Sequence, residues 1–259
     1  MAPHGWDLWG DVSAKYSKDA IGDVEVIQDF AKFPAGGSTW RGREWPTIVD
    51  EGKVTSLNKM TAAFDNFMQQ HDKTGNEKAD GYSRDVFIGL EGTEKEIVFD
   101  LLVKELPFSV EWLFFLDADK ALPVVKKEEE RLKGDGYGNG YLLQEELVRF
   151  TGDLSYQDRM IEDYPAYTDS LKPLVVDAIG RTPANEATIE FFKRVILTEV
   201  NSSAVARAAR RLLAALAVPR STASEENVYS RIVSDLRNDS LDVKLRALKL
   251  LQPYEANLA

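Results

Sequence analysis

One pattern dominates the chain after residue 90. Apolar residues recur at the three- and four-residue spacing of a helix, and short polar breaks containing glycine, proline or asparagine interrupt them. Between residues 171 and 251 the breaks fall near 180–183, 201, 219–224 and 238–240. Only the segment 151–168 is ambiguous in this part of the chain. A succession of helices over this length predicts an all-α fold.

The same spacing predicts earlier helices in the following segments: 19–33, 56–71, 93–106, 111–116, 122–133 and 142–150. Thr93 is a predicted N-cap, and Pro123 is predicted to open the helix 122–133. A polar segment, 72–84, separates the irregular beginning of the chain from the regular remainder. We therefore expect an N-terminal helical cap region at 1–89 and helical repeats at 90–259, together forming one continuous domain.

Two of the predicted helices repeat each other. They carry the same residue types at the same spacing, 38 residues apart: Val205, Ala209 and Leu213 in the first, and Val243, Ala247 and Leu251 in the second. A polar turn with Asp239 and Asp242 precedes the second helix, and the segment 116–125 contains a similar turn and helix start. This pattern resembles a HEAT repeat, an antiparallel helix pair with a period of about 40 residues.

The resemblance implies an irregular HEAT-like α-solenoid with a less regular N-terminal cap, and an irregular all-helical bundle is the alternative. Trp6, Trp9, Trp40 and Trp45 crowd the cap region. We interpret these tryptophans as core side chains rather than exposed interface anchors, because this region has little other apolar mass.

The composition excludes several kinds of chemistry. With no cysteine and two histidines among 259 residues, the chain has no disulfide, thiolate metal site, cysteine nucleophile or three-histidine site. Phosphate-loop, dinucleotide-binding, HExxH and GxSxG motifs are absent. We therefore predict no catalytic residues, no cofactor and a non-enzymatic role. No targeting segment or apolar run of membrane-spanning length is visible, so we expect a cytoplasmic protein without a membrane partner.

Negative charge is concentrated in the middle of the chain. Residues 71–170 carry 23 acidic and 12 basic side chains, whereas residues 171–259 carry 10 acidic and 13 basic ones. Complementary charge speeds association, so we predict that the acidic region binds a basic protein. The predicted partner-binding residues are acidic side chains and one tyrosine of this region: Asp117, Asp119, Glu128, Glu129, Asp135, Tyr137 and Glu145.

Structural alternatives stay open for these acidic residues. The glutamates at 128–130 spread around a helix and are typical of a solvated helix face. Asp117 and Asp119 form either a carboxylate pair for acid–base chemistry or, as we favour, caps for the following helix.

A glycine-rich segment at 135–146 resembles the calcium loop of a helix–loop–helix protein. Its candidate ligands are Asp135, Asn139, Tyr141 through its carbonyl, and Glu146. However, Tyr137 and Leu143 occupy positions where oxygen ligands belong, which leaves fewer oxygens than calcium needs. A glycine-rich turn between two helices is the favoured interpretation.

A basic cluster at Arg207, Arg210 and Arg211 offers a rival function, because some HEAT-like DNA-repair enzymes hold DNA on a basic face. The net charge of −11 argues against nucleic acid as a partner. We instead predict that these arginines pair with acidic residues of neighbouring helices.

By class resemblance, an acidic HEAT-like protein of this length is similar to some bacterial immunity proteins, which bind and neutralise a cognate toxin. This hypothesis predicts a basic toxin as the partner. A HEAT-like scaffold or regulator is the second hypothesis. A HEAT-like enzyme, either a DNA glycosylase or a bilin lyase, is the third.

Overall fold

The computed structural model describes residues 60–73 and 81–255, and the chain divides into two compact units, Met1–Val98 and Phe99–Ala259. The described residues form eleven α-helices and two short 3-10 helices, and they contain no strand. The predicted all-α fold is therefore confirmed. The predicted helix at 19–33 and the four tryptophans of the cap region lie outside the described residues.

In the first unit, the described elements are α1 (Ala62–His71), η2 (Arg84–Phe87) and the beginning of α3 (Gly92–Lys104). Thr61 caps α1, since its side chain accepts the N–H of Phe64. Glu94 accepts hydrogen bonds from both the N–H and the hydroxyl of Thr61, at 2.6 and 2.7 Å. The predicted N-cap Thr93 instead lies inside α3, which begins one residue earlier.

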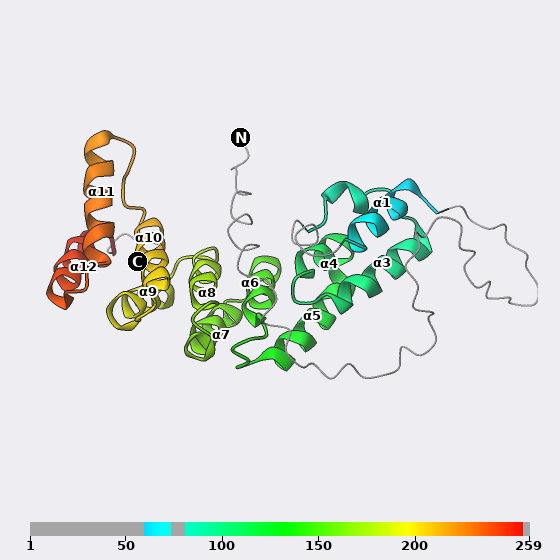
Figure 1. Cartoon of the computed structure of the whole chain (residues 1–259), viewed down its shortest axis with the longest axis horizontal. Coiled ribbons are helices and arrows are strands. Elements are labelled where there is room, and N and C mark those ends of the chain that lie inside the picture. The colour runs from blue at the N-terminus through cyan, green and yellow to red at the C-terminus, as the bar shows by residue number, and fades with distance from the viewer. Residues whose placement is uncertain (1–59, 74–80, 256–259) are drawn as a thin grey trace, which may run out of the picture. The chain divides into compact units, whose positions relative to one another are not determined.

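The second unit contains the end of α3 and the remaining helices (Figure 1): α4 (Val110–Leu116), α5 (Ala118–Leu132), α6 (Gly140–Thr151), α7 (Ser155–Asp163), η3 (Tyr164–Ala166), α8 (Lys172–Ile179), α9 (Glu186–Thr198), α10 (Ser202–Ala215), α11 (Ala223–Leu236) and α12 (Leu241–Glu255). The ambiguous segment 151–168 thus becomes α7 and η3. All four breaks predicted between residues 171 and 251 separate helices here.

Polar side chains begin several of these helices. Asn185 and Thr222 form capping boxes at α9 and α11, and Asn201 caps α10. Asp117 caps α5 by accepting the N–H of Lys120, which supports the structural interpretation of this residue. Because this cap starts the helix at residue 118, Pro123 lies within α5 and does not open it as predicted.

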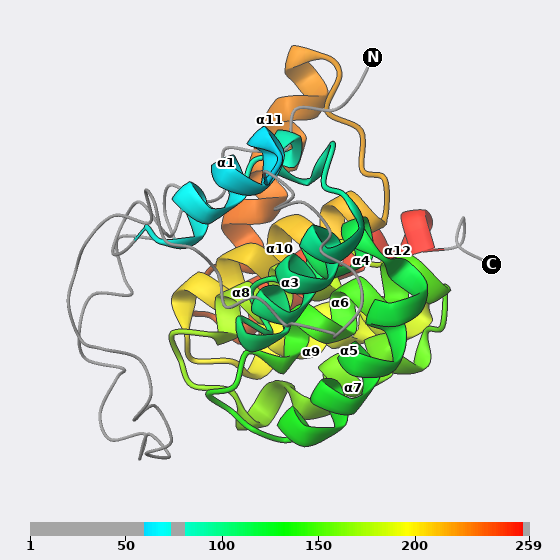
Figure 2. The same cartoon turned by 90° about the vertical axis from the view of Figure 1, so that its right-hand side faces the viewer.

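Helices of the second unit pack against their neighbours along the chain and against the next helix but one. α6 contacts α8, and α8 contacts α10, while α7 contacts α9. α8 and α10 accordingly lie on one side of the stack in Figure 2, and α7 and α9 lie on the other. We call α8 and α10 the upper layer, and α7 and α9 the lower layer. The HEAT resemblance itself remains a prediction.

The last helix pair departs from this alternation. α12 packs on α11 and on α9, whereas its sequence counterpart α10 packs on α8, α9 and α11. Five of the six repeated residues are buried, and Val243 is half-buried, so the repeat marks the core face in α10 and most of it in α12. The two similar helices nevertheless occupy different surroundings.

Candidate functional site

Three connections are joined to one another in the second unit: 133–139 between α5 and α6, 164–171 between α7 and α8, and 199–201 between α9 and α10. The N–H of Thr168 donates to the carbonyl of Gly136 at 3.3 Å. The side-chain amide of Asn201 donates to the carbonyl of Asp169 at 2.6 Å. We call these three connections the loop edge.

Glycine allows the first two connections to touch. A Cβ atom at Gly136 would lie 2.0 Å from the carbonyl oxygen of Ala166, so any side chain would force the loops apart. Asp135 then holds the turn by accepting the N–H of Tyr137 at 2.9 Å. The buried hydroxyl of Tyr167 accepts the N–H of Tyr141 at 3.0 Å and fixes the start of α6.

Glu199 holds the third connection in a similar way. One carboxylate oxygen accepts the N–H groups of Val200 and Asn201, and the other contacts the hydroxyl of Tyr164 and the ammonium of Lys172, at 3.1 Å each. Burial raises the pKa of Glu199, but the N–H of Asn201 and the side chains of Lys172 and Tyr164 outweigh burial and leave the pKa below its ordinary value. The turn is therefore fixed around an ionised carboxylate.

This fixed backbone displays two apolar side chains to solvent. Tyr137 is 79% exposed and Val200 is 89% exposed, although neither backbone is loose. Exposed carboxylates at Asp135 and Asp169 accompany them, and Asp169 also pairs with Lys172 at 3.3 Å. A pocket of about 290 Å³, lined in part by Tyr164, Lys172, Arg194 and Glu199, lies next to the third connection. The loop edge thus combines apolar anchors, negative charge and a small recess.

Of the predicted partner-binding residues, only Asp135 and Tyr137 lie on the loop edge. Asp117 and Asp119 lie at the start of α5 and are exposed. Glu128 pairs with Arg131 at 2.6 Å on the same helix. The predicted residues are thus spread over α5, the connection 133–139 and α6. Sequence reasoning missed Val200 and Asp169. A signal was available for Val200, because it is a single apolar residue between Glu199 and Asn201 at a predicted break.

The structure corrects the prediction that Glu129 belongs to an exposed acidic face. Its side chain is 1% exposed and accepts hydrogen bonds from Gln144 of α6 at 3.1 Å and Arg159 of α7 at 2.6 Å. The reason is its position on the buried stripe of α5, between Val125 and Leu132. Its prediction as a partner-binding residue is wrong, because no partner reaches this carboxylate in the folded chain.

The segment 135–146 of the calcium-loop alternative forms a turn and the first half of α6. Glu146 lies within α6 and pairs with Arg149 at 2.7 Å, while Asn139 adopts a left-handed conformation just before the helix. Asp135 is engaged by the N–H of Tyr137. Among residues 60–73 and 81–255, no group of three or more His, Asp or Glu side chains is placed to hold a metal ion.

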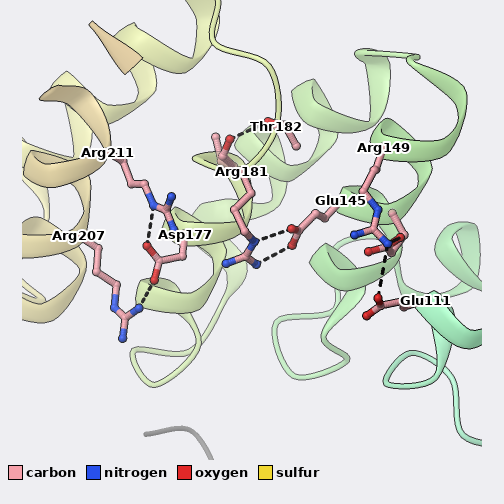
Figure 3. Close-up of polar contacts among 10 residues, drawn as sticks. Glu111, Glu145, Arg149, Asp177, Arg181, Thr182, Arg207 and Arg211 are labelled. Atoms are coloured by element: carbon pink, nitrogen blue, oxygen red, sulfur yellow. Dashed lines mark hydrogen bonds and ion pairs between the residues drawn. The ribbon is translucent and has the colours of Figure 1, made fainter. Parts of the chain in front are cut away.

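A second polar feature runs across α4, α6, α8 and α10 (Figure 3). We call it the charged row, and its members are Glu111, Glu145, Glu146, Arg149, Asp177, Arg181, Arg207 and Arg211. Arg181 binds Glu145 through two hydrogen bonds of 2.5 and 2.6 Å. Asp177 accepts from both Arg207 and Arg211. The predicted internal pairing is confirmed for Arg207 and Arg211, whereas Arg210 is exposed.

Glu146 is the member of the charged row whose ionised form is least favoured. Burial raises the pKa of Glu146 to about 7, and Arg149 only partly opposes this effect, while the nearby Glu145 and Glu111 add to it. Arg149 is largely exposed, so it compensates Glu146 less than a buried partner would. The four carboxylates and four guanidinium groups of the charged row make it neutral overall when all are ionised.

The described residues define a fold class: an all-α protein whose helices pack on their neighbours. Comparison with protein-family models, with curated proteins and with solved structures gave no match. None of the described helices is long and apolar enough to cross a membrane.

Proposed function

We propose that the chain is a non-enzymatic protein-binding protein that docks on a basic partner through its loop edge. The observation that carries the proposal is the display of Tyr137 and Val200 on two connections that hydrogen bonds tie to the same third connection, 164–171. Exposed side chains on an ordered backbone lose little entropy when they bind, which supports an interaction role for these two residues.

The energetics of association support this surface. A few aromatic and aliphatic anchors supply most of the binding free energy at protein interfaces, and ordered loops lose little entropy when they bind. The exposed carboxylates of Asp135 and Asp169 favour a partner with lysine or arginine around its own contact. The net charge of −11 adds attraction at longer range.

A narrower proposal is that the basic partner is a bacterial toxin and that the chain is its immunity protein. The acidic balance of residues 71–170 and the class resemblance support this proposal. Co-expression is the test: the captured partner should be toxic alone and harmless when this chain is present. A harmless partner would favour the scaffold or regulator hypothesis instead.

The binding experiment compares variants of the whole chain as baits in lysate from the source cells. Tyr137→Ala and Val200→Ser should each reduce capture of one basic protein at least tenfold, a loss typical of an interface anchor. Val228→Ser is the matched control, because Val228 is an exposed apolar residue of α11, outside the three connections.

Equal capture by all four proteins, with unchanged circular dichroism, would rule out the loop edge as the interface. Capture of a partner that is itself acidic would contradict the charge argument while leaving the apolar anchors in place. Turnover of a substrate by the purified chain would contradict the non-enzymatic proposal.

A further inference from the structure

The pocket of about 290 Å³ at the loop edge combines apolar walls with charged groups. Its lining residues come from the connections 164–171 and 199–201, the start of α8 and the end of α9: Tyr164, Pro165, Lys172, Arg194, Val195, Thr198 and Glu199. Pro165 and Val195 supply apolar walls, and the charges come from Lys172, Arg194 and Glu199. Because two of the three connections contribute lining residues, the pocket is continuous with the loop edge.

Two of the three charged groups in the pocket are already compensated. The carboxylate of Glu199 accepts the N–H groups of Val200 and Asn201 and pairs with Lys172 at 3.1 Å. Lys172 also pairs with Asp169 at 3.3 Å, so its ammonium contacts two carboxylates. Neither Glu199 nor Lys172 therefore needs a partner from outside the chain.

Arg194 is the charged lining residue without an acidic partner in the described part of the chain. Its side chain is exposed, and no described carboxylate forms an ion pair with it. The nearest acidic residues in sequence, Glu190 and Glu199, pair with Lys193 and Lys172 instead. The guanidinium of Arg194 thus keeps N–H donors available for a ligand.

Neighbouring rings place the guanidinium of Arg194 at the pocket. Its central carbon lies 5.7 Å from the ring centroid of Phe191, which is buried in α9. Its charge also acts on the hydroxyl of Tyr164: burial, Glu199 and Asp169 raise the pKa of Tyr164, whereas Arg194 opposes this rise. The positive charge is therefore felt at a side chain that lines the pocket.

We propose that this pocket receives a carboxylate side chain of the protein that docks on the loop edge, and that Arg194 binds it. The inference rests on the proposed function and adds one contact of opposite sign to an otherwise basic partner surface. A guanidinium matches a carboxylate through paired hydrogen bonds, and the apolar walls suit the methylene stem of an acidic side chain. A lysine or arginine of the partner would instead meet Arg194 and Lys172 here, so those side chains are left to exposed carboxylates such as Asp135.

The sign of a charge effect tests this contact. Removing a positive charge from this chain should strengthen binding of a basic partner through long-range attraction. The pocket predicts the opposite at one position: Arg194→Gln should weaken binding of the purified partner at least about fivefold, a loss typical of an interface residue that matters. Arg210→Gln is the matched control, because Arg210 is an exposed arginine of α10 outside the pocket, and it should leave the affinity unchanged or raise it.

Calorimetric titration of the full-length variants separates this inference from the loop edge itself. Full affinity in Arg194→Gln, with reduced affinity in Tyr137→Ala, would overturn the pocket contact and leave the loop edge in place. A loss in Arg194→Gln, with full affinity in Tyr137→Ala and Val200→Ser, would overturn those anchors and support the pocket. Equal losses in Arg194→Gln and Arg210→Gln would contradict a specific contact.

Cross-linking identifies the chemical group that enters the pocket. Arg194→Lys keeps the positive charge and adds an amine, and a water-soluble carbodiimide joins an amine to a carboxylate in contact with it as an amide while the carbodiimide becomes a urea. Mass spectrometry of the cross-linked complex should find position 194 joined to an aspartate or glutamate of the partner. Arg210→Lys should give no such product. Coupling of position 194 to acids of this chain only, or no coupling in a complex of undiminished affinity, would overturn the proposal.

Discussion

Replacing Glu129 and its neighbour Glu130 separately by glutamine tests the buried placement of the first. The two residues are adjacent and chemically identical, but Glu129 is 1% exposed while the side chain of Glu130 is 63% exposed. Both contact Arg159, Glu129 at 2.6 Å and Glu130 at 3.5 Å. Glutamine keeps the shape of the side chain and removes the negative charge.

Glu129→Gln should destabilise the fold by about 2–3 kcal/mol. The substitution removes a charge-assisted hydrogen bond to Arg159, which contributes about 1.5–3 kcal/mol, and turns an amide N–H toward a donor of Gln144 or Arg159. Arg159 is one-third exposed, so water partly compensates it and keeps the loss below that of a fully buried charge. Glu130→Gln should cost less than about 1 kcal/mol, as exposed ion pairs do.

Urea denaturation followed by far-ultraviolet circular dichroism measures both losses, and the melting temperature gives a second readout. A loss of 2–3 kcal/mol corresponds to roughly 4–12 °C for a domain of this size. Equal stability of the two variants would refute the burial argument, and the predicted solvated face at 128–130 would then apply to Glu129 as well.

Three further predictions concern other parts of the second unit. Ala247→Asp should lower the free energy of unfolding by at least about 2 kcal/mol in urea, because it buries an unpaired carboxylate against the core, and an unchanged midpoint would place Ala247 at the surface. Gly136→Ala should cost about 1–3 kcal/mol in the same assay, because its Cβ would overlap the carbonyl of Ala166, and no loss would mean that the connections separate freely. Glu146 has a folded pKa of about 7 against 4.5 in the unfolded chain, so the folded state binds more protons between these values and stability should fall as pH rises from 4.5 to 7. Glu146→Gln should flatten this dependence in urea titrations at several pH values, and an identical slope in the variant would assign the effect to another group.

The helices and their breaks could be predicted because their causes are local in sequence. Caps such as Asn201 and Thr222, and the apolar spacing that follows them, act within one or two helical turns. The pairing of Arg207 and Arg211 with an acidic neighbour also followed from charge alone, although the partner Asp177 was not named.

The surroundings of Glu129 and the loop edge could not be predicted in this way. Gln144 and Arg159 bind Glu129 from two other helices, so only the packed structure reveals that this carboxylate has internal partners. Val200 and Tyr137 are more than sixty residues apart in sequence, and hydrogen bonds between connections relate them. A charge count cannot distinguish an exposed carboxylate from one enclosed by helices.

The charged row also fixes how far each helix can slide along its neighbours. On α6, Glu145 faces Arg181 and Arg149 faces Glu111, and the two residues of α6 are four positions apart. Asp177 of α8 and Arg181, which follows the end of α8, are also four positions apart, and one is negative while the other is positive. A slide of α8 by one helical turn, about 5.4 Å, would bring Asp177 toward Glu145 and set two carboxylates against each other. Apolar side chains alone tolerate such a slip more readily, so the row specifies the register of the stack even where its ion pairs add little to stability.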